Sequence, residues 1–380
     1  MIEAGNPDPR YIRQTILPGV GEEGQARLHK ARVLIAGLGG LGSPASLYLA
    51  AAGIGTIGLA DNDVIERSNL HRQILHDDRL VGQPKVVSAR ERLLLLNPDL
   101  RIEVIPEGIT PENAVSLFSN YDLVIDGTDN FPSRYLINDA ACLAGKPLIY
   151  GSIHQFEGQV SVFYPKRGSP CYRCLFPELP EPGTVPNCAE AGVFGALCGI
   201  VGSWQASEAI KWIIGIGEPI LGQIKVLDIL SGRDRLVSLK KDPACPLCGK
   251  SPAIRKIHAE AYRFVCEPTF EEGTLPLEVD VRTAADLLQA ENPPLLVDVR
   301  EVHERQICSI GDGMHIPTGE IQFKWSALPR EEHLIVYCHH GLRSLFVARF
   351  LQEKGFHRVQ SLHGGIEAWS KEIDPTVPRY

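Results

Sequence analysis

The stretch VLIAGLGGLG at residues 33–42 constrains the fold of this 380-residue chain more than any other feature. Its apolar residues indicate a short buried strand, and Gly37, Gly39 and Gly42 follow with the G-x-G-x-x-G spacing. Glycines at this spacing let the chain turn sharply and let a phosphate approach the backbone amides that begin the next helix. The stretch therefore predicts a strand–turn–helix unit that binds a nucleotide.

The residues that follow extend this unit. An apolar helix pattern runs from the glycines to Gly53, and the strand Thr56–Ala60 then ends in Asp61. Asp61 follows Gly42 at about the 20-residue spacing at which a dinucleotide fold places an acid on the ribose hydroxyls. Taken alone, this pattern favours NAD or FAD, and a tight turn that binds no ligand is the alternative.

Cations beyond Asp61 bear on which nucleotide is bound. Arg72 and Lys85 lie within and after a polar run at the carboxyl edge of the predicted parallel sheet. A dinucleotide pyrophosphate can be bound largely by backbone amides, whereas a triphosphate carries enough charge to need such cations or a metal. These residues therefore favour ATP.

A further strand, Tyr121–Ile125, runs into the sequence DGTDN. Asp126 and Asp129 are then expected at the carboxyl end of that strand, where carboxylate oxygens can hold Mg²⁺ against the phosphates. The alternative is that Asp126 and Asn130 only make hydrogen bonds within a turn.

Composition limits the class of protein. With 38 basic and 46 acidic residues the formal net charge is -8, which argues against a nucleic-acid groove as the main function. We find neither a signal-peptide pattern nor an apolar run long enough for a membrane span, so we expect no membrane partner and a cytoplasmic location. The length predicts two domains.

Four of the ten cysteines form two C-x-x-C pairs, Cys171 with Cys174 and Cys245 with Cys248. Four thiolates complete a tetrahedral zinc site, so this spacing predicts a structural zinc. Redox-active pairs are the alternative, but neither pair lies on a predicted strand-to-helix turn.

Cys188 lies between the two pairs, in a segment rich in Pro, Gly and Glu. A cysteine in such a loop near a nucleotide crevice is a candidate nucleophile, and a chance free thiol is the alternative. The apolar stretch at residues 191–214 predicts a buried or interface helix.

These motifs together resemble the MoeB/ThiF family of ATP-dependent adenylyltransferases, over roughly residues 5–250. The motifs are RYIRQ, GLGGLG, SNLHRQ, Lys85, GTDN, the paired C-x-x-C and NCAEAGV. The resemblance implies a Rossmann-like fold with a mostly parallel sheet. It also implies transfer of AMP from ATP to the C-terminal glycine carboxylate of a small ubiquitin-like sulfur-carrier protein ending in Gly-Gly.

The resemblance assigns roles to individual residues. Arg13, which composition alone would place on a solvated basic face, corresponds to the arginine that reaches the nucleotide of the other subunit in a homodimer. Cys188 matches a loop cysteine whose function varies within the family. The residues implied at ATP are Gly39 and Gly40 at the phosphates, Asp61 at the ribose, Ser68, Asn69, Arg72 and Lys85 at the triphosphate, and Asp129 at Mg²⁺, assisted by Asn130.

We predict that the first domain occupies residues 1–250 and that a linker follows at 251–276. A second α/β pattern then occupies residues 277–380. The strand His333–Tyr337 opens onto Cys338-His-His-Gly-Leu-Arg343, and the helix Leu345–Lys354 follows. A cysteine in such a loop lies among inward N–H groups, which stabilise an anion. The alternatives are an inert buried cysteine and a cysteine phosphatase.

The loop has one residue fewer between cysteine and arginine than a typical phosphatase loop. With DVRE, HIPTGE and CHHGLRS, this part of the chain resembles a small α/β rhodanese sulfurtransferase domain. The resemblance implies that Cys338 carries a persulfide held by Arg343 and the loop amides. We interpret the remaining thiols as structural: Cys142, Cys198, Cys266 and Cys308.

Together the two halves predict an enzyme that makes a carrier-protein thiocarboxylate, using ATP, Mg²⁺ and Zn²⁺. A cysteine desulfurase or thiosulfate is the expected sulfur donor, and the fusion resembles proteins of molybdopterin, thiamin, cysteine, thio-tRNA or siderophore biosynthesis. One alternative is a ubiquitin-like conjugation enzyme that uses a Cys188 thioester, with the rhodanese part only a binding module. Another is an NAD-binding redox sensor, disfavoured by Arg72, Lys85 and Asp129.

Overall fold

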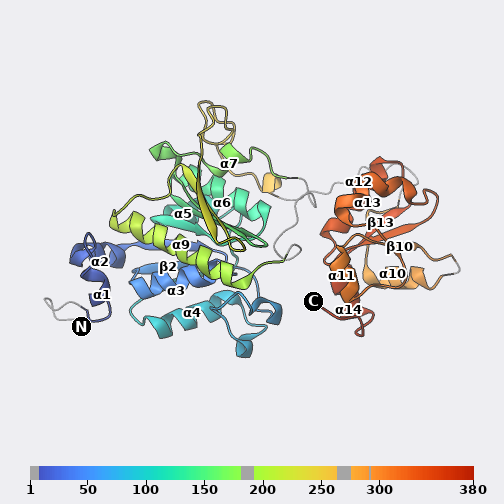
Figure 1. Cartoon of the computed structure of the whole chain (residues 1–380), viewed down its shortest axis with the longest axis horizontal. Coiled ribbons are helices and arrows are strands. Elements are labelled where there is room, and N and C mark those ends of the chain that lie inside the picture. Colours follow the sequence, from blue (N-terminus) through green and yellow to red (C-terminus); the bar gives the residue numbers. More distant parts are fainter. Residues whose placement is uncertain (1–7, 181–191, 263–274, 291) are drawn as a thin grey trace. The chain divides into compact units, whose positions relative to one another are not determined.

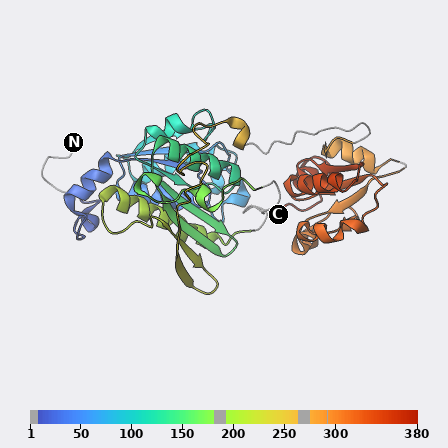
Figure 2. The same ribbon diagram turned by 90° about the horizontal axis from the view of Figure 1, so that it is seen from above.

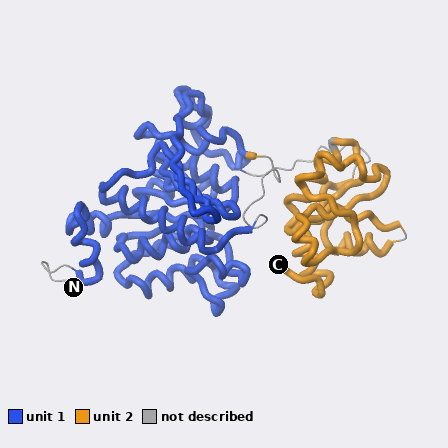
Figure 3. The backbone as a smooth tube through the Cα atoms, in the orientation of Figure 1, with its two compact units in different colours: residues 1–179, 187–263 blue, residues 180–186, 264–380 orange. Residues whose placement is uncertain are grey.

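The computed structural model describes residues 8–180, 192–262, 275–290 and 292–380 (Figure 1). The chain divides into two compact units, the first Met1–Leu179 with Asn187–Arg263 and the second Pro180–Pro186 with Phe264–Tyr380 (Figure 3). Within the described residues, no helix is both long and apolar enough to span a membrane. Cys188 lies outside the described residues.

An eight-stranded sheet forms the centre of the first unit, in the order β3-β2-β1-β4-β5-β6-β7-β8. The first five strands in this order run parallel, and β6, β7 and β8 pair antiparallel. The order changes direction at β1 and β4, which is where open α/β sheets bind ligands. The strands are β1 Arg32–Ala36, β2 Thr56–Ala60, β3 Arg101–Ile105, β4 Leu123–Asp126, β5 Leu148–His154, β6 Glu157–Phe163, β7 Gln223–Asp228 and β8 Arg233–Ser238.

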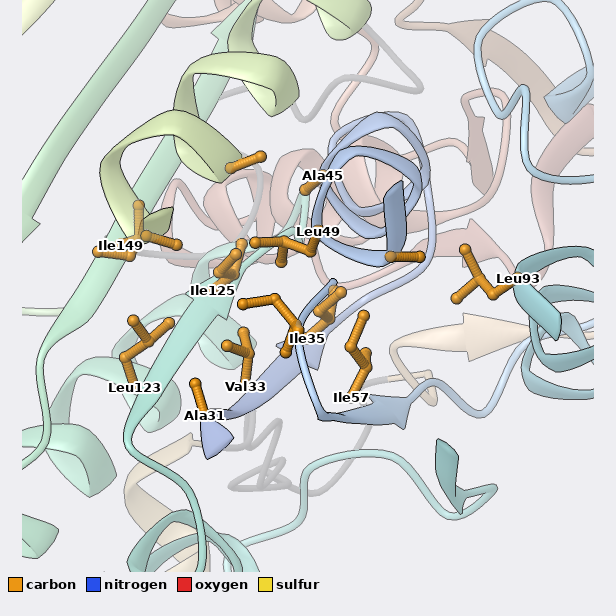
Figure 4. Packing of buried hydrophobic residues seen from close by; sticks show 14 of the residues in the cluster. Ala31, Val33, Ile35, Ala45, Leu49, Ile57, Leu93, Leu123, Ile125 and Ile149 are labelled. Carbon is orange, nitrogen blue, oxygen red and sulfur yellow. The ribbon is translucent and has the colours of Figure 1, made fainter. Parts of the chain in front are cut away.

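Helices cover both faces of this sheet because alternate residues of the buried strands point to opposite sides. Val33 and Ile35 of β1 pack with Leu49 under α3, as Figure 4 shows, whereas Leu34 packs on the other face. Helices α2 Gly21–Lys30, α3 Gly42–Ala52, α4 Lys85–Leu96 and α9 Gly195–Ile214 cover the first face, and α5 Ala114–Ser119, α6 Phe131–Ala144 and α7 Tyr172–Leu175 the second; α1 is Ile12–Thr15.

This arrangement confirms the predicted Rossmann-like α/β fold. The predicted strand Thr56–Ala60 has the same bounds in the structure. The β7–β8 hairpin was not predicted, because the residues of β8 are all exposed and polar residues interrupt any alternation. Figure 2 shows this hairpin extending from the body of the unit.

The second unit has a five-stranded parallel sheet in the order β11-β10-β12-β13-β9, which confirms the predicted small α/β domain. Its two faces carry separate apolar clusters. The strands are β9 Glu278–Val279, β10 Leu295–Asp298, β11 Met314–His315, β12 Leu334–Tyr337 and β13 Val359–Leu362; the helices are α10 Val281–Leu288, α11 Val302–Ile307, α12 Ile321–Lys324, α13 Leu342–Glu353 and α14 Gly365–Glu372.

The segment predicted as a linker is partly folded. Residues 251–262 belong to the first unit and end in a 3-10 turn, Ala259–Tyr262. The Tyr262 ring is buried with the apolar cluster that covers α6, and its hydroxyl donates to Oδ2 of Asp139 across 2.7 Å. Three apolar side chains of this segment, Ile254, Ile257 and Tyr262, pack into buried clusters of the first unit without a periodic pattern, so sequence periodicity could not reveal the contact. Residues 263–274 lie outside the described residues.

Candidate functional site

The glycine turn after β1 brings backbone close to backbone. Gly37 has a φ of 88°, a left-handed conformation that glycine adopts without strain. A Cβ at Gly42 would lie 1.9 Å from the Gly37 carbonyl oxygen, so only glycine fits at the start of α3. The turn therefore places Gly37, Gly39 and Gly40 in the lining of the pocket beyond the strand end, directly before α3 begins, as a phosphate site requires.

Asp61 lies at the end of β2, where it connects two backbone segments. Its Oδ2 accepts a hydrogen bond from the Leu38 amide across 2.6 Å, and its Oδ1 accepts one from Asp63 N across 2.8 Å. Burial raises the pKa of Asp61, although the charge of Lys85 and these two amides act in the opposite direction. The carboxylate thus fixes the wall of the pocket and keeps lone pairs for a ribose hydroxyl.

Two cationic side chains, Lys85 and Arg72, line the same pocket. The Lys85 side chain is buried, and its Nζ lies 2.8 Å from Oδ2 of Asp63. Arg72 donates from Nη1 to the carbonyl of Ser68 across 3.1 Å, which steadies it beside Gly40. Both cations are therefore placed where they can neutralise phosphate charge.

The end of β4 supplies the opposite wall. Asp129 is exposed and lines the pocket, so its carboxylate is available to a cation. Asn130 also lines the pocket, but its Oδ1 accepts a hydrogen bond from Ser133 N across 2.9 Å and so caps α6. The turn role that the sequence offered as an alternative for Asn130 is therefore present in the structure.

The structure brings most of the predicted ATP residues to one pocket but not all of them. Ser68 and Asn69 lie in the neighbouring 3-10 turn, Arg67–Asn69, outside the pocket lining. Arg13 lies exposed on α1 and does not line the pocket either. The predicted residues that line it are Gly39, Gly40, Asp61, Arg72, Lys85, Asp129 and Asn130.

Arg134 of α6 also lines this pocket, and the sequence reading missed it. Its guanidinium is buried, donates to the Thr128 carbonyl across 3.2 Å and lies over the Tyr150 ring at 5.2 Å. Its Nε is 3.7 Å from Oδ2 of Asp126, a carboxyl whose pKa is raised by burial. Only its position on the helix after DGTDN was visible in the sequence, and that position does not distinguish it from a surface arginine.

The four paired cysteines form a compact cluster. The Sγ–Sγ distances are 3.6 Å for Cys171 and Cys245, 3.4 Å for Cys174 and Cys248, and 4.0 Å for Cys171 and Cys174. The four sulfurs lie within 4.8 Å of one another. Zn–S bonds of about 2.3 Å in a tetrahedron separate the sulfurs by about 3.8 Å, so the cluster fits a tetrahedral ion. Hydrogen bonds from Cys171 and Cys248 lower the pKa of Cys174, which favours a thiolate there.

A buried ion pair anchors this cluster to helix α6. Arg173, between the cysteines of the first pair, donates from Nε and Nη2 to the carboxylate of Asp139 on α6 at 2.8–2.9 Å. Tyr262 donates to the same carboxylate. The end of the first unit is therefore held at the cysteine cluster by Asp139.

Cys338 of the second unit lies fully buried at the end of β12. Gly341 N lies 3.1 Å from its Sγ, and the hydroxyl of Ser344 lies 3.5 Å from it. These donors can stabilise a thiolate or a terminal sulfur on it. Helix α13 begins at Leu342, earlier than predicted, so the loop closes directly into the first turn of the helix.

Arg343 is occupied by a carboxylate that the sequence reading did not identify. Its Nη1 and Nη2 each donate to one oxygen of Glu304 across 2.7 Å, and both side chains are buried. Glu304 is on α11, far from the loop in sequence, so no local motif marks the pair. The geometry gives Arg343 a role in holding the loop, and direct contact with a persulfide stays a prediction.

Known proteins share both parts of the chain. Residues 11–247 match the model of the ThiF family, and residues 280–372 match that of the rhodanese-like domain. The probable adenylyltransferase/sulfurtransferase MoeZ of Mycobacterium tuberculosis is 42% identical over 376 residues, which cover 98% of this chain and 95% of that protein. The sulfur carrier protein adenylyltransferase of Thermus thermophilus is 51% identical over 252 residues, 65% of this chain and 93% of that protein.

Among solved structures, that of E. coli MccB with MccA-N7isoASN has a TM-score of 0.57 at 24% identity and covers 65% of this chain and 76% of its own. That likeness supports the fold alone.

Proposed function

Because this chain belongs to the ThiF family and also carries a rhodanese-like domain, we propose that it activates the C-terminal glycine of a small ubiquitin-like sulfur-carrier protein with ATP and then converts it to a thiocarboxylate. The observation that carries this proposal is the pocket in which Lys85, Arg72 and Asp129 surround the glycine turn. Such a pocket suits a triphosphate and its metal better than a dinucleotide.

In the first step a carboxylate oxygen of the carrier attacks the α-phosphorus of ATP, and the bond to the β-phosphate breaks. The products are the acyl-adenylate and pyrophosphate. Arg72 and Lys85 neutralise charge on the phosphates, Gly39 and Gly40 let the phosphates approach the backbone, and Asp61 holds the ribose. Asp129 would hold Mg²⁺, which would supply positive charge to offset the negative charge of the phosphates. Ser68 and Asn69 support Arg72 from the adjoining turn.

In the second step the terminal sulfur of a Cys338 persulfide attacks the acyl carbon and AMP leaves with the bonding electron pair. A thiol then attacks the Cys338 sulfur of this acyl disulfide, which releases the thiocarboxylate and leaves a disulfide between that thiol and Cys338. We propose Cys188 or a thiol of the donor system for this role. A thiol reductant then cleaves that disulfide by thiol–disulfide exchange and frees the Cys338 thiolate, on which a cysteine desulfurase or thiosulfate restores the persulfide.

The same proposal covers the partners and the metal. Zinc on Cys171, Cys174, Cys245 and Cys248 is supported by the sulfur geometry and would tie the end of the first unit to its middle.

A homodimer is proposed because Arg13 lies exposed outside the pocket, as an arginine that serves a partner subunit would. Thiols kept reduced, as the metal cluster and Cys338 require, suit the cytoplasm. We keep residues 277–380 as the proposed rhodanese domain and extend the proposed adenylation domain from residue 250 to residue 262.

Conjugation through a Cys188 thioester is the second candidate, and the comparisons do not favour it. MoeZ, which matches nearly the whole chain, is named for both adenylyltransfer and sulfurtransfer. Carrier-dependent exchange of pyrophosphate into ATP, together with mass spectrometry of the carrier, tests the proposal. Exchange without replacement of a carboxylate oxygen by sulfur would support conjugation instead.

A further inference from the structure

Tyr380 contacts both the Cys338 loop and the carboxylate that binds Arg343. Its hydroxyl accepts a hydrogen bond from Nη1 of Arg300 across 2.8 Å and donates to Oε1 of Glu304 across 3.1 Å. Burial raises the pKa of Tyr380, so the phenol stays protonated and keeps this donor at neutral pH. Tyr380 thus contacts the carboxylate that holds Arg343.

The ring of Tyr380 makes a second contact, with the loop itself. It stacks on His339 with ring centroids 4.3 Å apart and an interplanar angle of 24°, and His339 stacks in turn on His340 at 4.0 Å. His339 directly follows Cys338 and is buried. Burial, with the neighbouring His340, lowers the pKa of His339 to about 4, so the His339 ring is uncharged at neutral pH.

The groups behind Tyr380 are fixed. Arg300 is fully buried and donates from Nε and Nη2 to the two oxygens of Asp298, at the end of β10. Glu304 also accepts from the amide of Glu301 across 2.8 Å, within the capping box of α11. The hydroxyl of Tyr380 therefore sits between two anchored side chains, and its position is determined by the scaffold.

We propose that Tyr380 is a positioning residue for sulfur transfer at Cys338. Its ring restrains His339 at one end of the loop, and its hydroxyl, through Glu304, restrains Arg343 at the other. With both ends restrained, Gly341 N stays directed at Sγ. The inference rests on the proposed sulfurtransferase function and adds a residue that touches neither sulfur nor substrate.

The test is steady-state sulfur transfer from thiosulfate to cyanide by the full chain. Tyr380→Phe keeps the stack and loses the hydroxyl, and we expect kcat to fall about tenfold, as for loss of a hydrogen bond to a charged group, with the thiosulfate KM nearly unchanged. Tyr380→Leu loses both the ring contact and the hydroxyl contact, so its kcat should fall further. Val359→Ala is the control. It truncates a core residue beside the start of β12, at the other end of that strand from Cys338, and it should lower Tm and leave kcat nearly unchanged.

A double variant separates positioning from plain stability. If Tyr380 acts through Glu304, adding Tyr380→Phe to Glu304→Gln should cause little further loss of kcat, whereas independent effects would multiply. Multiplying losses, or a Tyr380→Phe variant with the kcat of the unmodified chain, would overturn the inference. If the unmodified chain transfers no sulfur although Cys338 is reduced and the chain is folded, the proposed function itself fails.

Discussion

The amide of Leu38 donates to Oδ2 of Asp61 across 2.6 Å, and this bond ties the glycine turn to the end of β2. Asp61 uses its other oxygen for the amide of Asp63, whose own carboxylate holds Lys85. The turn, the acid and the cation are therefore one connected structure. A change at any of them should disturb nucleotide binding rather than overall folding.

Lys85→Ala should lower carrier-dependent ATP–pyrophosphate exchange about 100-fold, because it removes a buried cation from the triphosphate site. Arg72→Ala should act in the same direction. Arg79→Ala is the matched control, since Arg79 is an exposed arginine paired with Asp77 in the next turn and does not line the pocket. Equal exchange rates in the Lys85 and Arg79 variants would show that Lys85 has no role in binding the triphosphate.

Asp129→Ala should lower exchange and raise the Mg²⁺ concentration needed for half-maximal rate, because an exposed carboxylate of the pocket is lost. Asp122→Ala, at the opposite end of β4, serves as the control. An unchanged Mg²⁺ dependence would place the metal on other ligands.

Metal analysis should find one zinc per chain, and Cys245→Ser should lose it and unfold at lower temperature. Cys142→Ser is a close control, because Cys142 packs beside the cluster without belonging to the set of four. The control should keep its zinc. A Cys245→Ser chain with full zinc content would contradict the assignment.

Acid should destabilise the first unit through His76. Burial lowers the pKa of His76 to about 4, so the unfolded chain binds a proton at a higher pH than the folded chain does. Stability should therefore fall as the pH drops from about 6.5 towards 4, and this residue should contribute about 2–3 kcal/mol of that fall by pH 4.5. Urea unfolding at pH 7 and pH 4.5 should show a smaller fall for His76→Gln. The same fall in both proteins would mean that His76 is not responsible.

Tyr262→Phe should destabilise the first unit by about 1–3 kcal/mol, since it removes a hydrogen bond to the buried carboxylate of Asp139. Tyr48→Phe changes an exposed tyrosine of α3 and should have no measurable effect on the free energy of unfolding. Equal unfolding free energies for the two variants would show that residues 251–262 contribute little to this unit.

Sequence reasoning succeeded where the chemistry is local. The glycine turn, Asp61 and the two C-x-x-C pairs depend on short sequence spacings. Each of these spacings strongly favours one local backbone geometry. The position of Cys338 in a loop between a strand and a helix was predictable for the same reason, because these elements follow one another directly. The parallel sheet followed from strands and helices in alternation.

The residues that sequence reasoning missed depend on distant segments. Glu304 meets Arg343, and Tyr380 meets Glu304, only after the sheet of the second unit has formed. Arg134 is recognisable only from its burial among aromatic rings. The segment before residue 263 resembles a linker in sequence because Tyr262 and Asp139, which hold it in place, are 123 residues apart.

Mass spectrometry of the carrier protein after reaction with a Cys338→Ala variant tests the central claim most directly, alongside Cys308→Ala as a control thiol of the same unit. With ATP, Mg²⁺ and thiosulfate present, the unmodified chain and Cys308→Ala should convert the carrier carboxylate to a thiocarboxylate. Cys338→Ala should form none while its ATP–pyrophosphate exchange stays nearly unchanged, because the adenylate forms in the pocket of the first unit. Full thiocarboxylate formation by Cys338→Ala would contradict the account.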